Sequence, residues 1–223
     1  MQLFYYVLIF FIGACIVSFA TVFVSDFTHQ QVWSHKRSNC DNCHNQIPFY
    51  YTIPIVGYLG AFGKCSKCNF PIKIWYPMSE LIGGLMLLSA AIFSHSLIWF
   101  LTIFFSLTLL ALSDFQFGYI YSYYYLPLII PALLHFSQLY LLEGLFVYFL
   151  MYVFQITTKS VGIADVEVLA ILTVLLGYVN AVYILFFACC LCLVVHFFQK
   201  KRSYRFIPYL SVATGIVYLI FID

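Results

Sequence analysis

Residues 3–24 have the sequence LFYYVLIFFIGACIVSFATVFV, which contains no charged side chain. About 20 apolar residues are enough for a helix to cross the hydrocarbon core of a bilayer, so this stretch predicts a membrane-spanning helix. No Lys or Arg precedes it and no well-placed small-residue cleavage site accompanies it. We therefore expect a retained first helix rather than a signal peptide.

The composition supports the same class of protein over the whole chain. Of the 223 residues, 64% are hydrophobic and only 8% are charged, which excludes a soluble globular domain and a disordered chain. The net charge of +2 comes with no basic tract interleaved with aromatic residues, so we expect no nucleic-acid partner. The sequence predicts an all-α, polytopic protein surrounded by the lipid bilayer.

One polar segment divides the chain into three parts. We assign residues 1–24 to the first transmembrane helix, 25–77 to an extramembrane loop, and 78–223 to further transmembrane helices. The third part contains seven apolar runs, at about 78–94, 97–113, 120–142, 144–158, 166–179, 181–198 and 206–222. Together with the first helix they predict about eight spans, several of them short for a bilayer.

The basic residues orient these spans. If the spans are counted in order, the loops after spans 1, 3, 5 and 7 face one side, and this side holds all the Lys and Arg residues: Lys36, Arg37, Lys64, Lys67, Lys73, Lys159, Lys200, Lys201, Arg202 and Arg205. Cytoplasmic loops carry an excess of positive charge. The 25–77 loop is therefore predicted to be cytoplasmic, and both termini are predicted to lie outside the cytoplasm.

The loop contains two Cys-x-x-Cys pairs, Cys40 with Cys43 and Cys65 with Cys68. Two such pairs can supply four thiolates to a tetrahedral Zn²⁺ ion, and four protein ligands leave no open coordination position for catalysis. A cytoplasmic location argues against disulfides. We predict a structural zinc site, with unligated thiols or a redox pair as the alternative.

Five acidic residues lie in or next to the predicted spans: Glu80, Asp114, Glu143, Asp165 and Glu167. Charged groups at such positions are functional candidates because burying them in the membrane is costly. Asp114 and Asp165 are both predicted at the cytoplasmic side, where helix packing can pair them as an aspartic peptidase requires. The alternative is that both merely mark helix ends, since Asp165 also suits a helix cap.

A long series of spaced residues runs through the loop: Arg37, Ser38, Cys40, Cys43, Ile47, Ile53, Pro54, Gly57, Tyr58, Leu59, Gly63, Lys64, Cys65, Cys68, Ile72, Tyr76, Pro77 and Glu80. Asp114 is followed six residues later by Ile120, and Gly162 is followed by Ala164 and Asp165. This pattern resembles the type IV prepilin leader peptidases, membrane aspartic proteases of the GxGD class. The motifs extend to about residue 175.

Two departures from that family concern the aspartate segments. The family usually continues its first segment with Ile-Pro-Asp, whereas Ile120 is followed by Tyr121 and Ser122. Its second motif is commonly Gly-x-Gly-Asp-x-Lys, whereas this chain has Ala164 before the acid and Glu167 at the lysine position. Both aspartates are retained, so the departures concern the local backbone and substrate contacts.

The resemblance implies an endopeptidase of the bacterial inner membrane with Asp114 and Asp165 as catalytic residues. Its substrate would be a prepilin or pseudopilin precursor, cut at the cytoplasmic face after a short basic leader. Many family members also methylate the new N-terminus with S-adenosylmethionine, so the resemblance leaves methylation open for this chain. It also leaves open a substrate or methylation role for Glu80 and Gly162.

Two other functions remain as alternatives at this stage. A non-catalytic membrane adaptor would use the zinc loop to bind a partner in pilus, secretion or competence assembly. A transporter would use Asp114 and Asp165 as an ion relay, although the spans show no evident inverted repeat.

Overall fold

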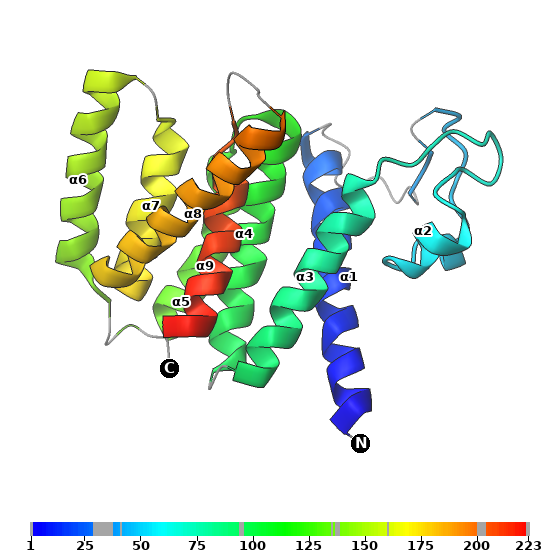
Figure 1. Cartoon of the computed structure of the whole chain (residues 1–223), viewed down its shortest axis with the longest axis horizontal. Coiled ribbons are helices and arrows are strands. Elements are labelled where there is room, and N and C mark those ends of the chain that lie inside the picture. Colours follow the sequence, from blue (N-terminus) through cyan, green and yellow to red (C-terminus); the bar gives the residue numbers. More distant parts are fainter. Residues whose placement is uncertain are drawn as a thin grey trace. The chain divides into compact units, whose positions relative to one another are not determined.

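The computed structural model describes residues 2–28, 38–40, 42–93, 96–134, 136, 139–159, 161–199 and 204–221. The predictions for Lys36, Arg37, Lys200, Lys201 and Arg202 therefore concern residues outside the described ranges. The chain forms two compact units, Met1–Phe93 and Ser94–Asp223. The described residues are mainly helical, with two isolated β-bridges, which confirms the all-α class (Figure 1).

The first unit is built on two long helices, α1 (Gln2–Thr28) and α3 (Trp75–Phe93), which pack along each other. Glycine allows their backbones to approach closely, because a Cβ atom added to Gly83 would lie only 2.2 Å from Cγ2 of Val17. Small residues at helix contacts are typical of membrane proteins. The segment between the helices contains the short helices η1 (Phe49–Tyr51) and α2 (Val56–Gly60).

The second unit contains the remaining helices, which are α4 (Leu97–Phe117), η2 (Ser122–Leu128), α5 (Ile129–Leu134), α6 (Leu141–Thr158), α7 (Ile163–Leu176), α8 (Tyr178–Gln199) and α9 (Ile207–Phe221). In Figure 1, α9 lies against α4 and α8, while α6 lies against α7. Fully buried apolar side chains such as Leu110, Leu172 and Leu210 form the core of this unit.

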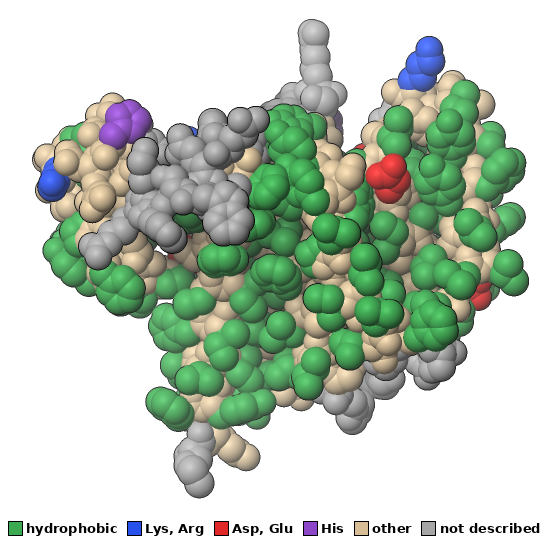
Figure 2. Space-filling view, turned by 180° about the vertical axis from the view of Figure 1, so that it is seen from behind, with side chains coloured by type: hydrophobic (Ala, Val, Ile, Leu, Met, Phe, Trp, Pro, Cys, Tyr) green, Lys and Arg blue, Asp and Glu red, His purple; other side chains and the backbone are tan. Residues whose placement is uncertain are grey.

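Five helices in the described residues are long and apolar enough to cross a membrane: α1, α3, α4, α6 and α8. Their exteriors are apolar, and Figure 2 shows hydrophobic side chains over most of the visible helical surface. The other three predicted spans correspond to shorter helices, namely η2 with α5, then α7, and then α9.

The predicted run at 120–142 differs most from the structure. It contains a 3₁₀ helix around Pro127 and an α-helix that ends at Leu134, and Tyr140 lies outside any helix. Proline lacks the N–H of a regular helix, which accounts for the change of helix type. The predicted boundary between the runs 120–142 and 144–158 is also wrong, because Glu143 lies in the first turn of α6, which begins at Leu141.

The connection between α6, α7 and α8 is held by specific contacts. The Glu143 carboxylate accepts the backbone N–H of Tyr178 at 2.7 Å, and the Tyr140 N–H donates to the Val174 carbonyl oxygen at 2.9 Å. A Cβ atom added to Gly144 would lie 2.2 Å from Cγ2 of Val174. These contacts fix α7, whose opposite end carries Asp165.

Candidate active site and metal centre

The two cysteine pairs of the first unit lie in two turns of the same construction. In the first turn, Cys40 N–H donates to the Asn45 carbonyl at 3.0 Å and His44 N–H donates back to the Cys40 carbonyl at 3.0 Å. The second turn repeats both bonds, from Cys65 to Phe70 at 2.9 Å and from Asn69 to Cys65 at 3.0 Å. Each turn thus presents its two sulfur atoms on one side.

A left-handed backbone residue follows the second cysteine of each turn. His44 has φ 53° and Asn69 has φ 56°. Asn adopts this conformation more readily than most non-glycine residues, and His is also enriched there. One β-bridge closes each turn, between Asn39 and Gln46 in the first and between Lys64 and Pro71 in the second.

The four sulfur atoms converge on one point. All four Sγ atoms lie within 4.8 Å of one another, with Cys40 and Cys68 at 3.7 Å and Cys43 and Cys65 at 3.9 Å. Four thiolates at Zn–S distances of about 2.3 Å form a tetrahedron of this size. The cluster has the donor set and geometry to hold a metal ion, and it is compatible with zinc.

Backbone N–H groups favour the thiolate form that a metal requires. Hydrogen bonding from Asn45 lowers the pKa of Cys43 to about 6, and backbone hydrogen bonds from Cys68 and Lys67 lower the pKa of Cys65. The turn geometry thus prepares the sulfur atoms of Cys43 and Cys65 for ligation, whereas Cys68, despite a backbone hydrogen bond from Phe70, has its pKa raised to about 11 by burial and by the neighbouring thiols.

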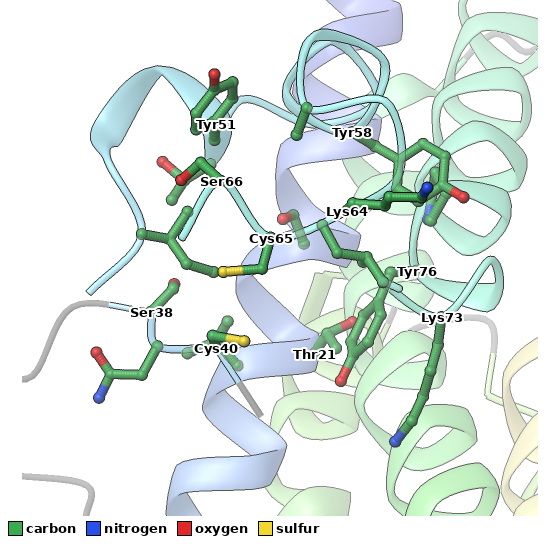
Figure 3. Close-up of a pocket in the computed structure, with 18 of the residues that line it drawn as sticks. Thr21, Ser38, Cys40, Tyr51, Tyr58, Lys64, Cys65, Ser66, Lys73 and Tyr76 are labelled. Atoms are coloured by element: carbon green, nitrogen blue, oxygen red, sulfur yellow. The ribbon is translucent and has the colours of Figure 1, made fainter. Parts of the chain in front are cut away.

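A cavity of about 370 Å³ lies between the cysteine turns and the facing ends of α1 and α3 (Figure 3). Its lining combines carboxylates from Asp26 and Glu80 with the ammonium group of Lys64 and the rings of Tyr51 and Tyr58. Both charges and aromatic faces are available to a ligand in this cavity.

Glu80 connects α3 to the loop beside this cavity. Its Oε2 atom accepts the backbone N–H of Ile55 at 2.8 Å. Ile55 has φ 63° and ψ −53°, a conformation that is strained for a β-branched residue and that places it at the start of α2. Glu80 therefore holds a strained backbone segment, a role that its position in the sequence did not indicate.

In the second unit, Asp114 lies near the end of α4, half-buried, four residues before the left-handed Gly118. Ile207, the first residue of α9, and Arg205 both lie close enough to act on the charge of its carboxyl group. The Oδ2 atom is buried and has no hydrogen-bond partner among the described residues.

Asp165 lies in the first turn of α7. Its Oδ2 atom accepts the backbone N–H of Gly162 at 3.1 Å, so the carboxyl group caps its own helix. Gly162 has φ −71°, which any residue can adopt, but a Cβ atom there would lie 3.0 Å from the Asp165 Oδ2. The glycine thus leaves room for the carboxylate.

The structure brings Asp114 and Asp165 close enough for their charges to interact through space. The Asp165 carboxyl group also accepts the backbone N–H of Gly162. Two like charges this close favour a state in which one group is ionised and the other carries a proton. Two acidic residues, one from α4 and one from α7, are thus within electrostatic reach of each other.

Three neighbours of the pair were not identified from the sequence. Arg205 and Ile207 act on Asp114, whereas the Tyr125 hydroxyl lies beside Glu167 and within electrostatic reach of Asp165. Pro208 was the available signal for the first two, because proline favours the first turn of a helix and so indicates that α9 begins directly after Arg205. No comparable signal identified Tyr125 within its row of tyrosines.

Known proteins match mainly the N-terminal part of the chain. Residues 11–94 match the family model of the Bacterial Peptidase A24 N-terminal domain. A Prepilin leader peptidase/N-methyltransferase of Myxococcus xanthus is 32% identical over 80 residues, covering 36% of this chain and 24% of the relative. The same-named protein of Burkholderia pseudomallei is 27% identical over 158 residues, covering 64% of this chain and 51% of the relative.

The chain thus aligns with about half or less of the length of these relatives. No solved structure matches the chain significantly. The resemblance read from the loop motifs is confirmed by the family model and by the two relatives, which share one descriptive name.

Proposed function

We propose that this chain is an aspartic endopeptidase that removes the basic leader from prepilin-like or pseudopilin precursors. The observation that carries the proposal is the electrostatic interaction between Asp114 on α4 and Asp165 on α7, in a chain whose residues 11–94 match the Bacterial Peptidase A24 N-terminal domain. The named relatives support prepilins as the substrate class.

The chemistry follows from the two carboxyl groups. The ionised carboxylate takes a proton from a water molecule, and the resulting hydroxide attacks the carbonyl carbon of the scissile peptide bond. The protonated carboxylic acid donates its proton to the carbonyl oxygen, which gives a neutral tetrahedral intermediate. When this intermediate collapses, the C–N bond breaks, the carboxyl group that took the proton of water donates it to the leaving amine, and the other carboxylate takes up a hydroxyl proton of the intermediate.

The cleavage would occur at the cytoplasmic face of the bacterial inner membrane. All ten basic residues fall on one side of the predicted spans, so residues 25–77 and both aspartates are assigned to the cytoplasm and both termini to the other side. A short basic leader would remain on this side, because positive charge is retained in the cytoplasm while the following apolar helix enters the membrane.

The cysteine cluster would hold a structural zinc ion, with Cys40, Cys43, Cys65 and Cys68 as its ligands. Four sulfur ligands leave no site for water or substrate on the metal. The ion would therefore fix the shape of the loop around the 370 Å³ cavity rather than take part in proteolysis.

S-Adenosylmethionine is the second ligand to consider, because the relatives' names include N-methyltransferase. When bound, it supplies a methyl group to an amine. The loop cavity offers charges of both signs and aromatic rings to this ligand, since Asp26 and Glu80 line it together with Lys64, Lys67 and Lys73, and Tyr51 and Tyr58 offer aromatic faces. Binding of labelled S-adenosylmethionine to the purified protein should weaken in Tyr58→Leu and persist in Asp165→Asn.

Co-expression with a tagged prepilin-like substrate tests the peptidase. The intact mass of the substrate should show leader loss with the wild type but with neither Asp114→Asn nor Asp165→Asn. An additional methyl mass on the wild-type product would establish methylation in the same spectrum. Leader loss in both variants would refute the aspartic mechanism, and no leader loss with a folded wild type would favour the adaptor.

A further inference from the structure

The loop of the first unit exposes a patch of large apolar side chains. We define this apolar patch by Phe49 and Tyr50 of η1, Val56 and Leu59 of α2, and Phe62 two residues beyond α2. The two short helices pack tightly on each other, because a Cβ atom added to Gly57 would lie 2.2 Å from the Tyr51 carbonyl oxygen. Large apolar side chains gathered on an exposed surface indicate an interaction site.

The backbone at Phe62 makes its exposure unusual. Phe62 has φ 51° and is 89% exposed, and Gly63 follows with φ 67°. A bulky residue in the left-handed region is strained, whereas glycine adopts the same conformation at little cost. A favourable contact of the Phe62 ring with a surface outside the loop accounts for phenylalanine at this strained position.

The patch lies at the depth of the membrane interface. Helix α1 has 27 residues, so its length of about 40 Å matches a bilayer together with its headgroup regions. The carboxylate of Glu80, which lies about 8 Å along α3, accepts the Ile55 N–H at the start of α2. A headgroup region is roughly 5–8 Å thick. Glu80 thus holds α2 near the boundary between headgroups and hydrocarbon.

The cavity confirms that the loop folds back along the helices. Its lining includes Thr21 of α1, which lies about 10 Å from the end of that helix at Thr28. Within the first unit, Figure 1 shows α2 beside α1 and α3, below the ends of both helices that join the loop. In Figure 2 the loop is the lobe at the left edge, with hydrophobic side chains on its lower side and His and basic side chains above them. The apolar side therefore faces the direction in which α1 enters the membrane.

The charges of the loop suit an anionic lipid surface. Among the described residues 42–79, the side chains of Asp, Glu, Lys and Arg type are Lys64, Lys67 and Lys73, all of them basic. Basic residues next to an anionic bilayer are attracted to its headgroups, and aromatic residues are enriched at the same level. An apolar protein partner would require the patch but not these cations.

We propose that the apolar patch docks into the membrane leaflet on the predicted cytoplasmic side, with the three lysines at the level of anionic headgroups. The loop is then anchored in the membrane surface in addition to being joined to α1 and α3. This anchor holds the cysteine cluster and the cavity at a fixed height over the bilayer. The inference goes beyond the proposed peptidase function and does not depend on it.

Photo-crosslinking of the full chain in lipid nanodiscs tests the inference. The photoreactive residue p-benzoylphenylalanine replaces Phe62 or, in a second variant, Leu59, so that one misfolded variant does not decide the result. His44 is the control position, because it is also exposed and has φ 53° but lies in the first cysteine turn. Burial of a phenylalanine ring is favoured by roughly tenfold or more, so lipid adducts should exceed those at position 44 by at least that factor.

The adduct masses also identify the lipid. In discs with equal amounts of phosphatidylglycerol and phosphatidylcholine, the anionic lipid should be preferred about fivefold or more, because one basic residue near an anionic surface contributes about 1 kcal/mol. Equal adducts with both lipids, or equal lipid yields at positions 44 and 62, would overturn the proposal. Adducts to protein alone would overturn it as well and would assign the patch to the second unit or to a second copy of the chain. None of these outcomes bears on Asp114 and Asp165, so the peptidase function is tested separately.

Discussion

The backbone N–H of Gly162 donates to Oδ2 of Asp165 at 3.1 Å, so the predicted catalytic carboxyl group also closes the first turn of its own helix. This bond orients the Asp165 side chain, and it involves only the backbone of Gly162. The space above Gly162 is occupied by the carboxylate itself, 3.0 Å from where a Cβ atom would lie. A methyl group there would compete with Asp165 for its position.

Gly162→Ala should therefore lower the cleavage rate by at least about tenfold, because small displacements of a catalytic group cost one to two orders of magnitude. The backbone at φ −71° accepts alanine, so expression and helicity should be unchanged. Gly60→Ala is the matched control, because its Cβ atom would meet only a Tyr51 ring atom at 3.8 Å. Equal kcat values for Gly162→Ala and the wild type would show that Asp165 does not need this space.

The packing of α6 on α7 gives a second prediction. A Cβ atom at Gly144 would lie 2.2 Å from Cγ2 of Val174, so Gly144→Ala should destabilise the second unit by about 1–3 kcal/mol through overpacking. Thermal unfolding in detergent, followed by circular dichroism, would measure the loss. Adding Val174→Ala removes the clashing methyl group and should recover much of the stability. A double variant less stable than the sum of both single variants would contradict this account.

The cysteine cluster gives a third prediction. Cys43→Ser or Cys68→Ser should each lower the zinc content of the purified protein from about one ion per chain to near zero, because a structural site needs all four thiolates. Cys190→Ser provides the control, since Cys190 lies on α8 outside the cluster. Elemental analysis by mass spectrometry gives the ratio. Wild-type zinc content in the Cys43 and Cys68 variants would refute the metal assignment.

The sequence was sufficient for features that depend on spacing. Two Cys-x-x-Cys pairs predicted one four-sulfur cluster, and the structure brings all four Sγ atoms together. Apolar runs predicted the helices, because hydropathy follows burial in lipid. The ends of the helices were less predictable: Pro127 changes the helix type within an apolar run, and Glu143 lies inside α6 because its carboxylate receives a backbone N–H from Tyr178.

Features that depend on contacts between distant segments could not be predicted. The basic residues were interpreted only as determinants of orientation, since a charge count does not reveal which helix end a guanidinium reaches. Arg205 reaches α4 because α9 begins two residues later and returns along α4. Glu80 was given only a substrate or methylation role, and its bond to Ile55 depends on how the loop folds back.

That bond supports the last prediction. Ile55 has φ 63° and ψ −53°, and its N–H is held by the Glu80 carboxylate at 2.8 Å. Glu80→Ala removes a hydrogen bond to a charged acceptor, so exchange of the Ile55 amide hydrogen should become roughly tenfold to a hundredfold faster. Ser79→Ala is the control on the same helix, because the Ser79 hydroxyl donates to Tyr76 within α3. Hydrogen exchange measured by mass spectrometry would resolve this segment. If exchange in residues 53–60 is equally slow in Glu80→Ala and the wild type, another contact holds the loop, and the Glu80 carboxylate is not needed for its structure.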